Sequence, residues 1–189
     1  MIPKIIHYCW FGGGQLSDLE NNCISSWSSI LSDFQIIRWD ESNFPIDKYP
    51  YVCAAYKAKK WAFVSDYVRV WALYKFGGIY LDTDYKILKT LDNLLDKKFF
   101  CGAENDEYVG TAIIGSEKGN WLLKKMLDYY DNNKFEISNG KYNMIPNTMI
   151  ITDILAEKGY HRGESEEIYK IYIAPKETFY PGSNKKIYG

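Results

Sequence analysis

Residues 73–84 read LYKFGGIYLDTD, and this stretch decides the fold. Its first four residues end a segment, residues 60–76, in which apolar side chains recur at near-helical spacing. Two glycines at 77 and 78 follow, and glycine commonly stops a helix at this position. Residues 79–81 are apolar and predict a short buried strand that ends at Asp82. A helix, a tight turn and a buried strand together indicate an α/β sheet.

The rest of the chain alternates in the same way. Apolar runs predict strands at residues 5–10, 34–39, 99–103, 112–114 and 168–173. Amphipathic segments predict helices at 18–31, 120–130 and 148–158. Prolines at 45 and 50 are expected to break regular structure in the stretch that follows the strand at 34–39. This alternation predicts an α/β fold with a mainly parallel central sheet. No linker or repeat divides the sequence, so residues 1–189 are expected to form a single domain.

Composition limits the class of partner. Hydrophobic residues make up 47% and charged residues 25%, and the net charge of −1 provides no basic field for nucleic acid. No signal sequence opens the chain and no apolar stretch is long enough for a transmembrane segment, so any membrane contact is expected to be peripheral. The four cysteines lack the spacing of a zinc site or redox pair. Cysteines that stay reduced indicate a cytoplasmic protein. A position at the inner face of the membrane is compatible with this expectation.

The triplet Asp82-Thr83-Asp84 directly follows the apolar strand at 79–81. In open α/β sheets, ligands bind beyond the carboxyl ends of the strands. Two carboxylates at such an end can hold a hard divalent cation that bridges two phosphates. The triplet alone is weak evidence, because such pairs also arise by chance in solvated turns.

A second pair strengthens the metal hypothesis. Asp66 and Arg69 are three residues apart on the preceding helix and therefore share a face. A helix ion pair is the simplest interpretation, but valines on either side of Asp66 indicate a partly buried carboxylate. The two glycines can fold this helix back beside the strand, so we expect Asp66, Arg69, Asp82 and Asp84 near one edge of the sheet.

At these residues the sequence resembles a known family. Residues 63–69 and 73–84 are similar to the sugar-binding region containing the DXD motif of glycosyltransferase family 32. That family includes yeast-type mannosyltransferases and bacterial capsule and lipopolysaccharide enzymes. The same block resembles the catalytic domains of large clostridial glucosylating toxins, and residues 5–13 resemble the first strand of both groups. The resemblance covers roughly residues 2–115.

The resemblance implies a GT-A-like nucleotide-sugar-binding fold and a metal-dependent, retaining hexosyltransferase that uses Mn2+ (or Mg2+). It implies a nucleotide-sugar donor, with a UDP-sugar as the expected form, and a saccharide or lipid-linked acceptor in surface polysaccharide synthesis such as capsule. Family members usually continue past this point with a segment that closes over the metal. The chain is therefore expected to lack a C-terminal segment.

The resemblance also implies roles for the matching residues. Trp10 would stack on the base, and Tyr8 beside it would join the donor-binding set. Asp66 and Arg69 would hold the donor sugar and its ribose side. Asp82 would contact the ribose or the metal through water, and Asp84 would ligate the metal directly. Together with Asp66 and Arg69, these two carboxylates form the expected catalytic set.

Other residues invite a simpler interpretation. His7 lies in an apolar strand and is expected to be a paired core histidine. The tryptophans at 61, 71 and 121 are expected to be core residues on helix faces. Residues 104–106 follow a strand and could equally line the site or form a loop. The alternative function is a non-catalytic module that binds a sugar or nucleotide sugar, which would leave the metal motif unexplained.

Overall fold

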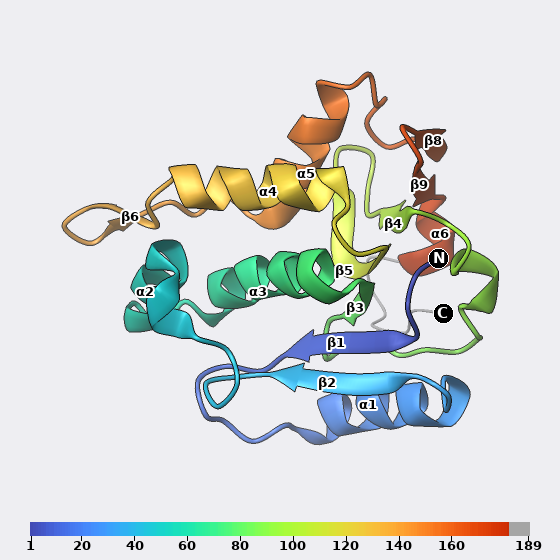
Figure 1. Ribbon diagram of the computed structural model, residues 1–189, viewed down its shortest axis with the longest axis horizontal. Coiled ribbons are helices and arrows are strands. Elements are labelled where there is room, and N and C mark those ends of the chain that lie inside the picture. The colour runs from blue at the N-terminus through green and yellow to red at the C-terminus, as the bar shows by residue number, and fades with distance from the viewer. Residues whose placement is uncertain (182–189) are drawn as a thin grey trace.

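The computed structural model describes residues 1–181, and within them the core is a seven-stranded mixed sheet (Figure 1). Its strand order is β2-β1-β3-β5-β4-β9-β8. The strands are β1 (Ile5–Cys9), β2 (Gln35–Trp39), β3 (Gly78–Leu81), β4 (Phe99–Ala103), β5 (Val109–Ser116), β8 (Glu166–Ile168) and β9 (Ile171–Ala174). Strands β5 and β8 run against the other five. The expectation of an α/β fold with a mainly parallel sheet is confirmed.

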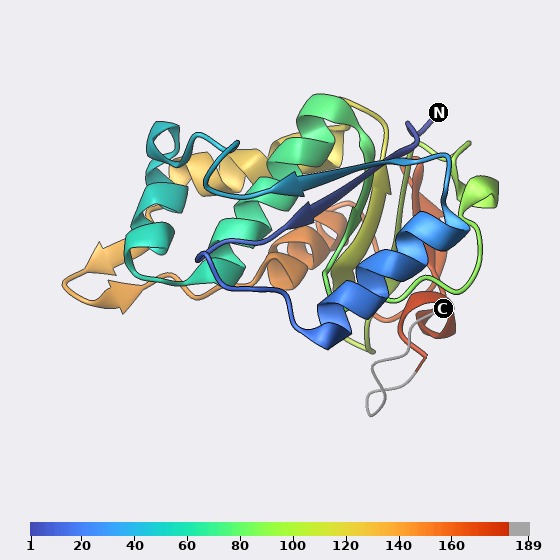
Figure 2. The same ribbon diagram turned by 90° about the horizontal axis from the view of Figure 1, so that it is seen from below.

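Helices cover both faces of this sheet (Figure 2). The longer helices are α1 (Asp18–Ile30), α3 (Trp61–Phe76), α4 (Trp121–Asn132) and α5 (Asn147–Ala156), all within a few residues of their predicted positions. Helix α1 packs on one face, whereas α3 and α4 pack on the other. Smaller elements are α2 (Pro50–Lys57), α6 (Lys176–Phe179) and a hairpin of β6 (Glu136–Ser138) and β7 (Lys141–Tyr142). Among residues 1–181, no helix combines the length and apolarity that crossing a membrane requires.

Two segments differ from the prediction. The single strand expected at residues 168–173 is wrong, because the chain turns back at Tyr169 and Lys170 to form the β8–β9 hairpin. Both residues have positive φ, 49° and 66°, which suits a tight hairpin turn but is unusual for non-glycine residues. Pro50 was expected to interrupt regular structure. It instead occupies the first position of α2, where its missing N–H costs no hydrogen bond.

The connection from α3 to β3 depends on its two glycines. Gly77 and Gly78 have φ values of 69° and 107°, which disfavour residues with side chains. A Cβ on Gly78 would lie 2.5 Å from the carbonyl oxygen of Ile5. The close approach sets β3 parallel to β1, with Ile79 opposite Ile6. The carboxyl ends of both strands therefore lie on the same edge of the sheet.

His7 on β1 is a paired core residue, as expected. Its side chain is fully buried, and its Nδ1 accepts a hydrogen bond from the indole N–H of Trp39 at 3.1 Å. The ring Nε2 lies 2.9 Å from the carbonyl oxygen of Gly77, so Nε2 carries the proton and donates to it. Protonating Nδ1 would set two donors against each other.

We expect His7 to make the protein less stable in mild acid. Burial lowers the pKa of His7 from 6.5 to about 4. A lowered folded-state pKa gives stability that is fully present above pH 6.5 and is lost as the pH falls through about 4. The size of the shift corresponds to about 3 kcal/mol of unfolding free energy. Denaturant unfolding of His7→Gln between pH 4 and 7 should lack this part of the pH dependence.

The matched control is His161→Gln, because the His161 side chain is 76% exposed. That variant should retain the wild-type pH dependence. An unchanged slope in His7→Gln would contradict the assignment, since the other titrating groups are common to all three proteins.

Candidate functional site

A cleft of about 540 Å³ lies where β1 and β3 end, against one side of α3. Its lining residues lie in or just after these two strands, on α3, or at the start of α1 and in the segment before it: Cys9, Trp10, Phe11, Gly12, Gly14, Glu20, Trp61, Ala62, Ser65, Arg69, Tyr80, Asp82, Thr83 and Asp84. Four of the six predicted site residues are in this lining. Of the other two, Asp66 lies behind Arg69, and Tyr8 lies in the core on the α1 side of the sheet.

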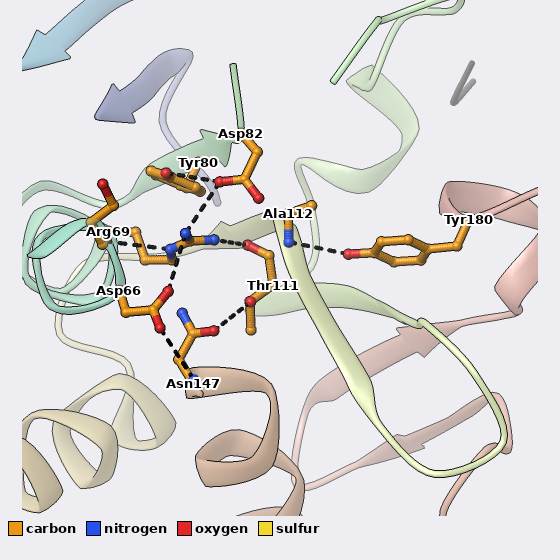
Figure 3. Close-up of polar contacts among 9 residues, drawn as sticks. Asp66, Arg69, Tyr80, Asp82, Thr111, Ala112, Asn147 and Tyr180 are labelled. Carbon is orange, nitrogen blue, oxygen red and sulfur yellow. Dashed lines mark hydrogen bonds and ion pairs between the residues drawn. The ribbon is translucent and has the colours of Figure 1, made fainter. Parts of the chain in front are cut away.

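The guanidinium of Arg69 connects three elements at this edge (Figure 3). Its Nη2 lies 3.2 Å from Oδ1 of Asp66 on the same helix and 3.2 Å from Oδ1 of Asp82 after β3. Its Nη1 donates to the carbonyl oxygen of Thr111 on β5 at 2.7 Å. The planar group also lies over the Tyr80 ring, with Cζ 4.4 Å from the centroid. The predicted helix ion pair exists, and it extends to the first aspartate of the triplet.

Asp82 is held in place by both its backbone and its side chain. Its Oδ1 accepts a hydrogen bond from the Tyr80 hydroxyl at 3.0 Å, and its N–H donates to the carbonyl oxygen of Ala112 at 2.8 Å. Burial raises the pKa of Asp82, and the nearby Arg69 acts in the opposite direction. One third of the Asp82 side chain is still exposed to the cleft side. The carboxylate is thus pre-oriented and remains within reach of a ligand.

Asp66 is the inner carboxylate of the network. Burial raises its pKa to about 6, against the opposing effect of Arg69. Its Oδ2 accepts a long hydrogen bond, 3.4 Å, from the backbone N–H of Asn147 at the start of α5. A helix N-terminus favours a negative charge at this position. The carboxylate is therefore held between a guanidinium and a helix end.

Sequence reasoning missed Asn147 and Thr111, which complete this network. The Thr111 hydroxyl donates to Oδ1 of Asn147 at 2.7 Å. The Asn147 side-chain nitrogen is buried and has no hydrogen-bond partner within residues 1–181. Pro146 before it indicates a helix start, but nothing in the sequence connects that start with Asp66, 81 positions away. A buried donor without a partner indicates a place for a ligand or water.

The C-terminal part of the described chain supports both sides of the triplet. The Tyr180 hydroxyl accepts from the backbone N–H of Ala112, whose carbonyl holds the N–H of Asp82 (Figure 3). The Tyr85 hydroxyl, one residue after the triplet, donates to the carbonyl oxygen of Phe179 at 2.9 Å. Helix α6 and Tyr180, which follows it, therefore help to hold the acidic triplet in position.

Two tryptophans line the cleft. The indole N–H of Trp10 donates to the carbonyl oxygen of Gly14 at 2.6 Å, which holds the ring across the glycine turn. Trp61, expected in the core, is half-buried: it packs against the core and also lines the cleft wall, where a Cβ on Gly12 would be 2.8 Å from its ring. Its spacing on the helix could not distinguish the two positions. The predicted core role of Trp71 is confirmed by its contacts with other buried rings.

Tyr8 does not join the cleft. Its ring packs edge-to-face on Trp27 of α1, with centroids 5.6 Å apart, because alternate residues of β1 face opposite sides of the sheet. Its donor-binding role stays a prediction. Residues 104–106 are not among those that line the cleft; burial raises the pKa of Glu104, and the charge of Asp82 adds to this rise.

The two carboxylates of the triplet fit a hard cation that a ligand helps to hold. Asp82 and Asp84 offer the oxygen donors that Mg2+ and Mn2+ prefer. Residues 1–181 contain no group of three or more His, Cys, Asp or Glu side chains placed to hold a metal ion. Diphosphate oxygens and water would have to fill the remaining positions. The donor set therefore suits a cation that binds together with a diphosphate.

The chain is similar to several known proteins. Residues 17–100 match the family described as "Glycosyltransferase sugar-binding region containing DXD motif". Inositol phosphoceramide mannosyltransferase 3 of Schizosaccharomyces pombe is 29% identical over 67% of this chain and 36% of its own length. An uncharacterized glycosyltransferase of Acanthamoeba polyphaga mimivirus is 30% identical over 78% of this chain and 61% of its own length. The chain thus spans less than two thirds of either relative.

A solved structure shows the same fold. The PaToxG glycosyltransferase aligns with a TM-score of 0.59 at 17% sequence identity, covering 82% of this chain and 68% of the toxin chain. DXD-motif glycosyltransferases usually depend on a divalent metal. Through the matched region and the named relatives, the chain is similar to glycosyltransferases of the DXD type.

Proposed function

We propose that this chain is a metal-dependent retaining glycosyltransferase. It would move a hexose from a UDP-sugar to a saccharide or lipid-linked acceptor in the synthesis of surface polysaccharide such as capsule. The observation that carries the proposal is the position of Asp82 and Asp84 at a strand end, in one cleft with Trp10 and Arg69. The similarity to a relative named inositol phosphoceramide mannosyltransferase 3 supports a lipid-linked acceptor.

Each end of the cleft suits one part of such a donor. Trp10 offers a flat apolar face for the base, and its ring is already held by Gly14. Asp82 and Asp84 would hold Mn2+ (or Mg2+), which when bound neutralises charge on the departing diphosphate. The sugar would then lie toward Asp66, where the carboxylate and the unpaired Asn147 nitrogen can receive and donate hydrogen bonds.

Arg69 acts here as a positioning residue. Its contacts with Asp66, Asp82 and Thr111 leave the guanidinium committed to the protein. It holds the sugar-side and diphosphate-side carboxylates at a set separation. In the transfer step, the acceptor oxygen bonds to the anomeric carbon as the bond from that carbon to the diphosphate oxygen breaks. The acceptor proton leaves on the diphosphate, so the step requires no nucleophile from the protein.

A screen of sugar nucleotides for manganese-dependent hydrolysis and transfer tests the proposal. We expect release of nucleoside diphosphate from at least one UDP-sugar, and no release in the presence of a chelator. Manganese-dependent diphosphate binding without turnover of any donor would instead indicate a non-catalytic binding module. Absence of both binding and turnover would remove the proposal altogether.

Trp10→Ala is expected to weaken nucleotide binding by roughly 1–3 kcal/mol, the usual contribution of an aromatic ring stacked on a base. Trp10→Phe is the matched variant, because it keeps a flat face and loses only the hydrogen bond to Gly14. It should retain most of the affinity. Calorimetry with uridine diphosphate and manganese measures both, and equal affinity in wild type and Trp10→Ala would make this ring purely structural.

A further inference from the structure

The hydrogen-bond ladder between β3 and β5 ends irregularly at the first residue of the acidic triplet. These antiparallel strands pair in register up to Leu81 opposite Ile113, so Asp82 comes opposite Ala112. Opposed residues of a hydrogen-bonded antiparallel pair normally exchange two bonds. The Asp82 N–H donates to the carbonyl oxygen of Ala112 at 2.8 Å, but the return bond from the Ala112 N–H to Asp82 is not made within residues 1–181. The ladder therefore stops halfway through this pair.

The hydroxyl of Tyr180 takes the place of that return bond. It accepts the Ala112 N–H at 3.2 Å (Figure 3). The carbonyl oxygen of Asp82 accepts instead from the N–H of Tyr85, at 2.9 Å. A carbonyl that accepts from the N–H three residues further on closes a β-turn. This turn, residues 82–85, carries both carboxylates of the triplet, and a return bond from Ala112 would draw the same carbonyl toward β5.

The sheet provides a fitted place for Tyr180. Gly102 on β4 and Gly110 on β5 lie opposite each other. A Cβ on Gly110 would lie 2.2 Å from the hydroxyl oxygen of Tyr180, and a Cβ on Gly102 would lie 2.8 Å from the ring of Phe179. Only glycine lets the two aromatic rings approach the strands this closely. The Tyr180 side chain is consequently buried, and its hydroxyl reaches the end of the ladder.

We propose that Tyr180 is a positioning residue for the donor diphosphate. Its hydroxyl ends the β3–β5 ladder at Asp82 and thereby fixes the turn that presents Asp82 and Asp84 to the cation. The inference rests on the proposed function, which assigns these carboxylates to the metal and the diphosphate. Tyr180 is not among the residues that line the cleft, so it acts through Ala112 and the turn.

Tyr180→Phe tests this role, because it keeps the ring and removes only the hydroxyl. We expect manganese-dependent binding of uridine diphosphate to the full chain to weaken about three- to tenfold in calorimetry, as the loss of one hydrogen bond does. Without ligand, the Tyr85 N–H should exchange faster in NMR, because the turn opens more often. A residue that only stabilised the fold would leave the exchange of this one amide in step with the others.

Tyr160→Phe is the matched control, since its hydroxyl donates to the carbonyl oxygen of Glu164 outside the cleft. It should leave both the affinity and the exchange of the Tyr85 N–H unchanged. Wild-type affinity and wild-type exchange in Tyr180→Phe would overturn the inference. A wild type that binds no uridine diphosphate would overturn the proposed function first, whereas normal binding by both wild type and Tyr180→Phe would overturn this inference alone.

A double-mutant cycle shows whether the effect passes through the glycine pair. Gly110→Ala should displace the Tyr180 ring and weaken binding of uridine diphosphate at least as much as Tyr180→Phe does. In a Tyr180→Ala background the added methyl group meets no ring, so Gly110→Ala should cause no further loss. Residues in contact give such non-additive effects. Additive losses would show that Gly110 and Tyr180 act independently and would contradict the proposed route.

Discussion

Asp84→Ala is expected to abolish manganese-dependent binding of uridine diphosphate by a protein that still folds. Asp84 lies at the end of β3 in the cleft, and its role would be to ligate the metal directly. Its charge raises the pKa of Asp82, so the two carboxylates repel each other when no cation is bound. Removing one carboxylate leaves a single ligand. Turnover should fall roughly 100- to 1,000-fold, as when one group that stabilises transition-state charge is lost.

Stability and binding separate the two effects of this substitution. We expect Asp84→Ala to keep a cooperative thermal transition, which shows that the protein is folded when its binding is measured. Asp96→Ala is the matched control, since Asp96 is an exposed carboxylate outside the cleft. It should bind metal and diphosphate normally. Wild-type affinity in folded Asp84→Ala would rule out the metal assignment.

Arg69→Met should destabilise the fold by about 3–5 kcal/mol, the usual result of removing one partner of a buried ion pair. The substitution leaves Asp66 buried without its cation and breaks the link from α3 to Thr111 and Asp82. Methionine fills much of the same volume, so lost packing contributes little. Chemical denaturation at pH 8 measures the loss.

The loss should depend on pH in a defined direction. Burial already raises the pKa of Asp66 to about 6, and removing Arg69 raises it further. A group with a raised folded-state pKa contributes stability that is present at low pH and is lost as the pH rises through that pKa. Arg69→Met should therefore be less destabilised at pH 5 than at pH 8. A constant difference would contradict this explanation.

A second substitution provides the control. In Asp66→Asn combined with Arg69→Met, the fully buried carboxylate is gone, and only Asp82, whose side chain is one third exposed, loses its cation. The double variant should be more stable at pH 8 than Arg69→Met alone, and its stability should lose the pH dependence above. If the second substitution destabilises additively, the charge of Asp66 is not the cause of the loss.

Much of the fold could be predicted from local pattern. The helix at residues 61–76, its glycine stop and the strand before Asp82 all followed from spacing, because periodicity and glycine conformation act over a few neighbours. The same local pattern predicted the metal motif at a strand end. The prediction from local pattern was wrong at Tyr169 and Lys170, where a hairpin turn uses residues that do not normally adopt positive φ. It also missed α2, where Pro50 starts a helix.

The sequence by itself thus determined the α/β class, the edge of the sheet that carries the triplet, and the ion pair of Asp66 with Arg69. Only the tertiary structure decided which groups meet those residues. Asn147 reaches Asp66 from a helix 81 positions away, and Tyr180 supports the triplet through Ala112. The physical reason is that pairing and desolvation depend on contacts between distant segments. Such contacts exist only after the chain packs, and one sequence carries no local trace of them.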